Sequence, residues 1–525
     1  MTLHSVIRAA LNVSVTAFKR WWLIGVISIA IFVFATRVPP NMDEFLQYHQ
    51  LVCHLFPNAT ENVFREGCYG YYDLKIFGKF LPLRSFLYVG FTPSLFYLPM
   101  YLLWPYYLSA RVMGILALLV ITYMIHRVTR VPLWLSGLIV LFSFPVVFQC
   151  ITDRGPVLYQ MALMFVMLYL STRPSPLRGV LAGLIMFVCI EQKPFFVNFI
   201  PAVLIVGFFL LKPVFEAGDR AGRLMILKSL LIAAVVAAVP TVILMTAQTR
   251  YGCQYYNDLL RLKSVSPLNF TSQIYHMHKN LIPSLVDFSR FANSIYDVRD
   301  TATTLTQLLW VVFGIIFFIG QVYAPRGIDL RRNALLAGSS GAFLLCLYLV
   351  NLSPHSLRGH HYVLAFPFLL LGIALSVEYI YRHVRALAVL LVLIVAVLNV
   401  GIAYKVVKTP THWHDDWSKV KVLDYLRQDS IASEYVYVIP DWGIYCLFAL
   451  YGSKQQIVLY VDPFDNPSDI TRIAEIAQRR NRTHLFIAQR STFTNSRLIN
   501  TAYPNLKLME YLGYNEKDAW MIKAE

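Results

Sequence analysis

An adjacent pair of carboxylates, Asp43 and Glu44, follows the first apolar segment of the chain and precedes a loop rich in aromatic residues. Ionisable groups beside a membrane span are costly to place and are therefore candidates for functional sites. A carboxylate here could act as a general base towards a hydroxyl group. Taken alone, Asp43 is more simply interpreted as a helix-end cap or a solvated loop charge. A functional role for it therefore depends on the other charged residues that accompany it.

Similar groups follow three later apolar segments: Asp153 the third, Glu191 and Lys193 the fifth, and Arg358 and His361 the ninth. Because odd-numbered spans all end on one face of a membrane, these groups can surround a single cavity. Carboxylates beside cations suit the activation of a hydroxyl next to an anionic lipid phosphate. Asp153 could instead cap the next helix, and Lys193 and Arg358 could extend their charged ends to water. The indication of a common site is that all of these groups are expected on the same face of the membrane.

The composition indicates a polytopic membrane protein. Of 525 residues, 57% are hydrophobic and 14% charged, and the formal net charge is +17. The basic residues form short clusters between apolar runs, which indicates a positive-inside bias and not a nucleic-acid partner. We expect about eleven membrane-spanning helices, near 21–38, 109–126, 132–150, 155–171, 179–192, 194–211, 229–248, 305–323, 334–351, 362–380 and 386–405.

The distribution of basic residues predicts the orientation. With a cytoplasmic N-terminus and a retained first span, the inner loops and N-terminal tail carry roughly sixteen basic residues, and the short outer loops carry only Arg154, Lys193 and Arg358. The transmembrane part then covers 1–408, with a first outer loop at 39–108 and a long outer loop at 249–304. Residues 85–107 contain prolines and aromatic residues that suit interfacial or re-entrant helices.

The composition becomes soluble and charged from about residue 409. Short β-type runs at 435–439, 456–461 and 483–487, with an amphipathic helix at 468–480, predict a small α/β domain over 409–525 on the outer side. Two His pairs, at 276 and 278 and at 412 and 414, lack a complete set of metal ligands. Cys53 and Cys68 share the first outer loop and could form a disulfide there.

The order of these motifs resembles the GT-C superfamily of membrane glycosyltransferases, and most closely the branch of protein O-mannosyltransferases and lipid A aminoarabinose transferases. The resemblance covers about residues 21 to 405. It is carried by Asp43-Glu44, by Thr92-Pro93 to Tyr97 leading into Ser109-Ala110-Arg111, by Asp153, by Ala182-Gly183 to Lys193-Pro194, and by His361-Tyr362 to Pro367. The sequence departs from the family pattern at Gln192, His361 and Ala365, where relatives usually have Thr, Arg and Pro.

The resemblance implies an inverting transfer of a sugar from a polyprenyl-phosphate donor to an acceptor hydroxyl of a glycan, lipid or protein. It implies Asp43 as the base, with Glu44 and Asp153 positioning the acceptor or, in some relatives, a divalent cation. Lys193 and Arg358 would stabilise the departing phosphate, with Arg358 replacing the family arginine from three residues upstream of His361. The residues expected to line the substrate and lipid cavity are Tyr48, Tyr97, His361 and Tyr362.

Two other classes of function also fit a basic, aromatic cavity at a membrane interface. One is a transporter or flippase of lipid-linked sugars, although paired broken helices and charges at mid-span are not evident in the sequence. The other is a non-catalytic assembly protein whose tail binds a partner. A bacterial plasma membrane is the expected location, since no retention signal is visible.

Overall fold

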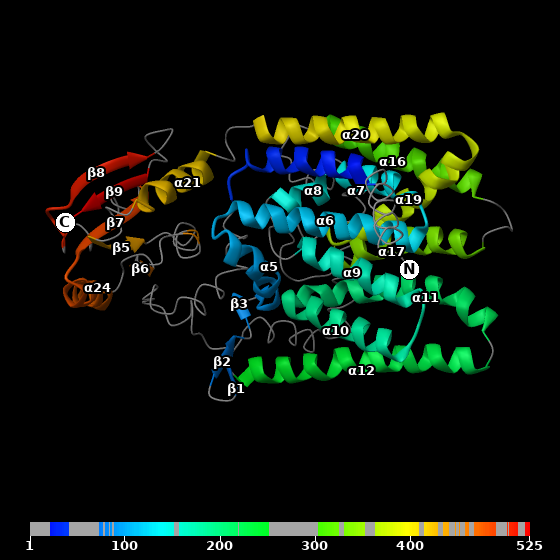
Figure 1. Cartoon of the computed structure of the whole chain (residues 1–525), viewed down its shortest axis with the longest axis horizontal. Helices are drawn as coiled ribbons and strands as arrows, with labels where there is room; N and C mark the ends of the chain where they lie inside the picture. Colours follow the sequence, from blue (N-terminus) through cyan, green and yellow to red (C-terminus); the bar gives the residue numbers. More distant parts are fainter. Residues whose placement is uncertain are drawn as a thin grey trace, which may run out of the picture.

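The computed structural model consists of a bundle of roughly parallel helices with a β-sheet at one end (Figure 1). We call that end of the bundle the sheet-side end, and the opposite end the far end. The structure describes residues 21–40, 73–76, 79–82, 84–86, 89–151, 157–218, 220–250, 303–324, 330–351, 363–408, 414–428, 434–439, 447, 451, 457–460, 467–489, 501, 503–512 and 520–524.

Every apolar run expected to cross the membrane contains helical structure. The helices of the bundle are Trp21–Ala35, α5 (Thr92–Leu103), α6 (Leu108–Thr129), α7 (Leu133–Leu141), α8 (Phe144–Ile151), α9 (Val157–Ser171), α10 (Pro176–Gln192), the 3-10 helix η1 (Pro194–Phe199), α11 (Ile200–Ala217), α12 (Arg220–Arg250), α16 (Thr303–Tyr323), α17 (Leu330–Asn351), α19 (Phe366–His383) and α20 (Arg385–Lys408).

The described helices confirm a mostly helical polytopic membrane protein, but fewer of them than expected are long enough to span. Five meet the length and hydropathy of a span, and six do if the bent pair α7 and α8 is one crossing. Three further apolar helices, Trp21–Ala35, α9 and the part of α17 from Arg332 to Leu347, are shorter. By length and composition, the described helices therefore support fewer crossings than the about eleven expected.

The span predicted near 132–150 is broken in the structure: α7 and α8 together have the length and hydropathy of a crossing, but they meet at an angle of 70°. Asn399, buried in α20, accepts a hydrogen bond from the Phe144 backbone N–H at 2.9 Å. This side chain from a distant helix satisfies a donor at the first turn of α8, where the helix itself has no acceptor. Pro145 follows at a position that tolerates the missing N–H.

Helix α12 lies along the edge of the bundle and packs against α10 (Figure 1). An added Cβ at Gly179 or Gly183 would meet the backbone of Ser229 or Ala233, so the two glycines permit close approach. The Ser229 hydroxyl also donates to the Ser175 carbonyl at 2.9 Å. Small residues four apart are a common interface between membrane helices, and they explain how α12 is held while most of it faces outward.

Within the predicted first outer loop, the described residues form short strands followed by one helix. Strands β1 (Asp73–Ile76) and β2 (Lys79–Pro82) form one antiparallel pair, and β3 (Arg84–Phe86) and β4 (Val89–Gly90) form another. Within 85–107 the structure has the single helix α5 and not the helix pair considered from the sequence. Trp104 ends α5, and its backbone N–H donates to the Met100 carbonyl at 2.8 Å.

The C-terminal part forms a five-stranded mixed sheet in the order β6-β5-β7-β9-β8, as expected of an α/β unit. The parallel strands β5 and β6 and the adjacent β7 lie where short β-type runs were predicted, and β8 and β9 add antiparallel strands. The elements are α21 (His414–Leu426), β5 (Tyr435–Ile439), β6 (Ile457–Tyr460), α24 (Pro467–Arg480), β7 (Thr483–Gln489), β8 (Lys507–Leu512) and β9 (Trp520–Ala524).

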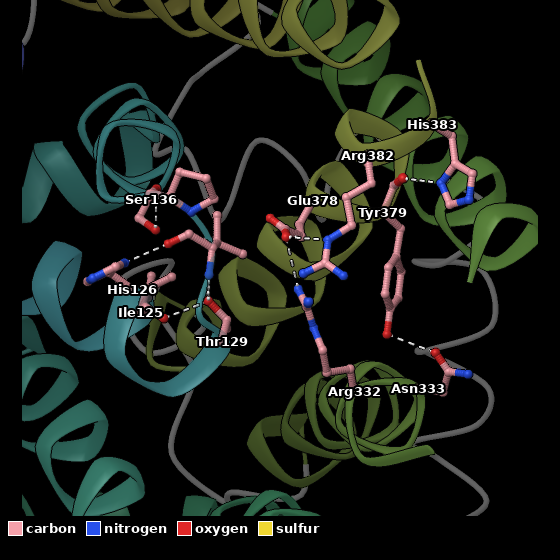
Figure 2. Close-up of polar contacts among 12 residues, drawn as sticks. Ile125, His126, Thr129, Ser136, Arg332, Asn333, Glu378, Tyr379, Arg382 and His383 are labelled. Atoms are coloured by element: carbon pink, nitrogen blue, oxygen red, sulfur yellow. Dashed lines mark hydrogen bonds and ion pairs between the residues drawn. The ribbon is translucent and has the colours of Figure 1, made fainter. Parts of the chain in front are cut away.

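A buried ion cluster joins α17 to α19 at the far end of the bundle (Figure 2). One carboxylate oxygen of Glu378 lies 3.5 Å from Arg332 and 2.7 Å from Arg382. Beside it, the Tyr379 hydroxyl donates to Asn333 at 2.8 Å. Glu378 and Arg332 are both buried, so their pairing lowers the cost of keeping two charges from water.

Candidate functional site

The end of α10 presents three consecutive buried polar side chains at the sheet-side end of the bundle. Glu191, Gln192 and Lys193 are 6%, 0% and 2% exposed. Pro194 follows them and disfavours helical backbone at the residue before it. Lys193 accordingly adopts extended backbone, with φ −155° and ψ 107°, and η1 begins after it. The sequence Glu-Gln-Lys-Pro therefore ends a helix and buries a cation at the turn.

Glu191 holds the N-terminus of α5. Its carboxylate accepts hydrogen bonds from the Phe91 backbone N–H at 2.5 Å, the Thr92 backbone N–H at 3.3 Å and the Thr92 hydroxyl at 2.5 Å. A helix N-terminus has free N–H groups and a positive partial charge, both of which favour a carboxylate. With three donors engaged, Glu191 is suited to position α5 and not to accept a proton from a substrate.

Gly90 makes room for this contact. A Cβ added at Gly90 would overlap the Glu191 carboxylate and its backbone carbonyl. The strand β4 can therefore pass over the end of α10 only because residue 90 lacks a side chain. No local sequence pattern indicates this requirement, since Gly90 and Glu191 are about one hundred residues apart.

Gln192 brings a buried amide to the site. Neither its Oε1 nor its Nε2 has a hydrogen-bond partner in the described structure. The neighbouring Gln160 uses its Nε2 to bind the Cys189 carbonyl at 2.7 Å, and its own Oε1 has no partner there. Buried amide groups without partners are uncommon in native structures and call for an explanation, which a bound polar ligand would provide.

Arg111 lies in the second turn of α6 and is fully buried. Its backbone carbonyl accepts a contact from the Cys150 thiol at 3.9 Å, and an added Cβ at Gly114 would meet Cys150. The last turn of α8 therefore packs on the start of α6. Sequence reasoning included Ala110-Arg111 in a motif but did not select Arg111 as a site residue, because a buried arginine cannot be distinguished from an interfacial one by position alone.

Only two of the nine predicted site residues, Lys193 and Tyr97, lie in the described part of the structure, and both are at the sheet-side end. The remaining seven lie outside the described residues: Asp43, Glu44, Tyr48, Asp153, Arg358, His361 and Tyr362. Their convergence stays a prediction. Cys53 and Cys68 also lie outside the described residues, whereas Cys150, Cys189 and Cys346 are free and buried.

Tyr97 is buried between α5 and the C-terminal part of the chain. Its hydroxyl contacts the Ser109 hydroxyl and lies 3.0 Å from the Tyr451 hydroxyl. The rings of Tyr101 and Tyr106 lie 6.4 Å from that of Tyr451. These four tyrosines connect α5 to the C-terminal part. The predicted role of Tyr97 in a substrate cavity stays a prediction.

A second contact involves Tyr106, which lies between α5 and α6. Its hydroxyl donates to the Asp424 carboxylate of α21 at 3.2 Å, and the Arg427 guanidinium lies 4.8 Å from the Tyr106 ring. Burial raises the pKa of the Asp424 carboxyl, although the Tyr106 hydroxyl and the Arg427 charge oppose the shift. Burial also raises the pKa of Tyr106, so its hydroxyl stays protonated and able to donate.

The described residues contain no group of three or more His, Cys, Asp or Glu side chains that could hold a metal ion. The carboxylates that the resemblance associates with a divalent cation, Asp43, Glu44 and Asp153, lie outside this part of the chain. Lys193 and Gln192 are poor metal ligands, because one is a cation and the other a single neutral amide. The described site therefore fits an anion and hydroxyl groups better than a metal.

No family model matches the sequence, and no curated protein matches it significantly. Solved structures do match. The chain is similar to ArnT from Cupriavidus metallidurans bound to undecaprenyl phosphate, with a TM-score of 0.54 and 11% identity over 97% of this chain and 98% of that one. The apo structure of the same ArnT matches with a TM-score of 0.40 and 10% identity over the same shares. The chain thus shares the fold of this ArnT over nearly its full length.

Proposed function

We propose that this ArnT-like chain is an inverting glycosyltransferase that moves a sugar from a polyprenyl-phosphate donor to an acceptor hydroxyl. The observation that carries the proposal is Lys193, a lysine 2% exposed at the sheet-side end of a bundle whose solved relative binds undecaprenyl phosphate. An ammonium group is a compact partner for a phosphate. The positive-inside bias supports an extracytoplasmic site and a cytoplasmic N-terminus, and we propose a bacterial plasma membrane as the location.

The reaction needs a base, a nucleophile and a stabilised leaving group. Asp43 takes the proton from the acceptor hydroxyl, and the hydroxyl oxygen forms a bond to the anomeric carbon of the sugar. The bond from that carbon to the phosphate oxygen breaks on the opposite face, and polyprenyl phosphate leaves with the electron pair. Lys193 and Arg358 stabilise the negative charge that develops on the phosphate. Glu44 and Asp153 position the acceptor.

The described residues contribute support for this chemistry. Gln192 places an amide with free donors and acceptors beside Lys193, which suits the hydroxyl groups of a sugar. Glu191 anchors α5 next to both, so the described helix of the predicted first outer loop is held near the cation. Rigid placement of this kind matters because small displacements of reacting groups cost large factors in rate.

The experiment measures transfer of radiolabelled sugar from a panel of polyprenyl-phosphate sugars to membrane extracts. Purified wild type should give a labelled product, and Asp43→Asn should bind donor without forming product. Lys193→Met should lower kcat/KM by at least about 100-fold, because it removes a charge from the leaving group. Lys228→Met, an exposed lysine on α12, is the matched control and should leave the rate unchanged.

Three outcomes separate the candidate functions. Product from wild type only supports the transferase and identifies its donor. Movement of the lipid across vesicles without product would favour the transporter, and no effect of Asp43→Asn or Lys193→Met on either readout would favour an assembly protein. Equal rates for Lys193→Met and Lys228→Met would refute the assignment of Lys193 to the phosphate.

A further inference from the structure

A polar cavity lies at the far end of the bundle, away from the site described above. Its volume is about 260 Å³, and it lies between the last turn of α6 and the turn that joins α9 to α10. The residues that line it are His126, Arg127, Val128, Arg130, Tyr169, Thr172 and Arg173. This cavity is large enough for a phosphate group and part of its substituent.

Tyr169 organises the guanidinium groups beside this cavity. Its hydroxyl accepts a hydrogen bond from Arg127 at 3.1 Å, and the Arg127 guanidinium lies 5.4 Å from the Tyr169 ring centre. The Arg178 guanidinium lies 5.9 Å from the same ring, and Arg127 lies 5.7 Å from Tyr123. Two arginines thus share one aromatic ring, which restricts their rotamers before any ligand arrives.

The opposite wall of the cavity is also fixed. His126 donates from Nδ1 to the Val131 carbonyl at 2.7 Å, and the Thr129 hydroxyl accepts from the Val131 N–H at 3.2 Å (Figure 2). These bonds hold the turn in which Arg130 takes a left-handed backbone with φ 62°. Arg130 therefore belongs to an ordered turn, although left-handed backbone is unfavourable for an arginine.

The positive charge at this cavity is not neutralised within the described structure. None of Arg127, Arg130, Arg173 and Arg178 forms an ion pair with a described carboxylate. At the same end, by contrast, Glu378 pairs with two arginines. A positive-inside bias would account for the presence of these four charges, but it requires neither a cavity nor a shared aromatic ring.

We propose that this cavity binds the phosphate of an anionic molecule, with Arg127 and Arg173 as its main ligands. Guanidinium groups can bind phosphate oxygens with two parallel hydrogen bonds, which lysine cannot do. The cavity lies at the ends of apolar helices, where phospholipid headgroups meet a membrane protein. A lipid phosphate is therefore the expected source, and a soluble phosphate is the other. The inference is independent of the proposed transferase.

The test is a titration of the full-length protein in neutral detergent with phosphatidylglycerol, monitored by native mass spectrometry. Phosphatidylcholine and inorganic phosphate are separate arms. The double variant Arg127→Gln/Arg173→Gln should lose at least about tenfold in phosphatidylglycerol affinity, because hydrogen bonds to charged groups are lost. Arg127→Lys/Arg173→Lys keeps the charge and should still bind several-fold more weakly. Tyr169→Phe should also weaken binding, since Arg127 loses its anchor.

The matched control is Arg220→Gln/Lys228→Gln, which removes two exposed charges from α12. It should bind phosphatidylglycerol like wild type.

The proposal fails if the arginines serve only the positive-inside bias. In that case Arg127→Gln/Arg173→Gln and the control Arg220→Gln/Lys228→Gln will lose phosphatidylglycerol affinity equally, and Arg127→Lys/Arg173→Lys will bind like wild type. Binding of inorganic phosphate alone, lost in Arg127→Lys/Arg173→Lys, supports the anion site and assigns it to a soluble phosphate. If wild type binds neither phosphatidylglycerol nor inorganic phosphate, the proposed anion site is refuted. Size-exclusion profiles of all variants establish that they are folded.

Discussion

Replacing Glu191 with Gln should loosen α5 without changing the shape of the side chain. The carboxylate accepts three hydrogen bonds from Phe91 and Thr92. A glutamine has one neutral acceptor oxygen, so at least one donor loses its partner and the others lose a charged one. Hydrogen bonds to charged groups contribute about 1.5–3 kcal/mol each and neutral ones about 1 kcal/mol. The free energy of opening α5 should therefore fall by about 3 kcal/mol.

A change of that size corresponds to about 100-fold in the opening equilibrium of α5. Hydrogen exchange read by mass spectrometry should show it as a fall of about 100-fold in the protection of peptides from 92–103, with α20 unchanged. Gly90→Ala should lower the protection of α5 at least as much, because its new methyl group would overlap both the carboxylate and the backbone carbonyl of Glu191. The double variant should be no worse than Gly90→Ala alone, since that change already displaces the side chain of residue 191.

Two matched controls accompany this measurement. Gly25→Ala places a methyl group where no atom lies within 4 Å, and Glu216→Gln changes a carboxylate in an exposed pair with Lys212. Neither should alter the protection of α5. Additive effects of Gly90→Ala and Glu191→Gln, or unchanged protection in Glu191→Gln, would refute the view that this carboxylate holds α5.

Three further predictions concern Gln192, Glu378 and Asp424. Gln192→Leu should raise the melting temperature and lower the transfer rate, because it replaces an amide without a described partner that we assign to substrate. Glu378→Gln should destabilise the protein by about 3–5 kcal/mol, whereas combining Glu378→Leu with Arg332→Met should restore most of the melting temperature. The raised folded-state pKa of Asp424 makes its contribution to stability greatest below its unfolded pKa of about 3.9, and that contribution is lost as pH rises through the folded value. Asp424→Asn should therefore abolish this part of the fall in melting temperature above about pH 4, and an unchanged profile would refute the assignment.

Local pattern was sufficient to locate most helices and the first three strands of the C-terminal sheet. Apolar runs and β-type runs are properties of neighbouring residues, and β5 and α24 begin within a residue of their predicted starts. Strands β8 and β9 were missed because charged residues interrupt them. In addition, β9 pairs with β8 and with the more distant β7, and no obvious turn sequence marks a hairpin.

Features that depend on distant partners could not be predicted. The bend between α7 and α8 is associated with Asn399, which lies 255 residues from the N–H it binds. Glu191 looked like one of several charges at outer helix ends, and only its contact with Thr92 reveals a positioning role. Lys193 was selected as a charge at a helix end, and the structure shows that it is buried where Pro194 ends α10, while its role at a phosphate stays a prediction.

The paired hydroxyls of Tyr97 and Tyr451 have a consequence for how such chains can diverge. A residue of the predicted first outer loop and a residue of the C-terminal part meet across 354 positions of sequence, so a change in one alters the surroundings of the other. The two segments should therefore be inherited together. Hybrid proteins assembled from two relatives should keep their activity only when the loop and the tail come from the same parent.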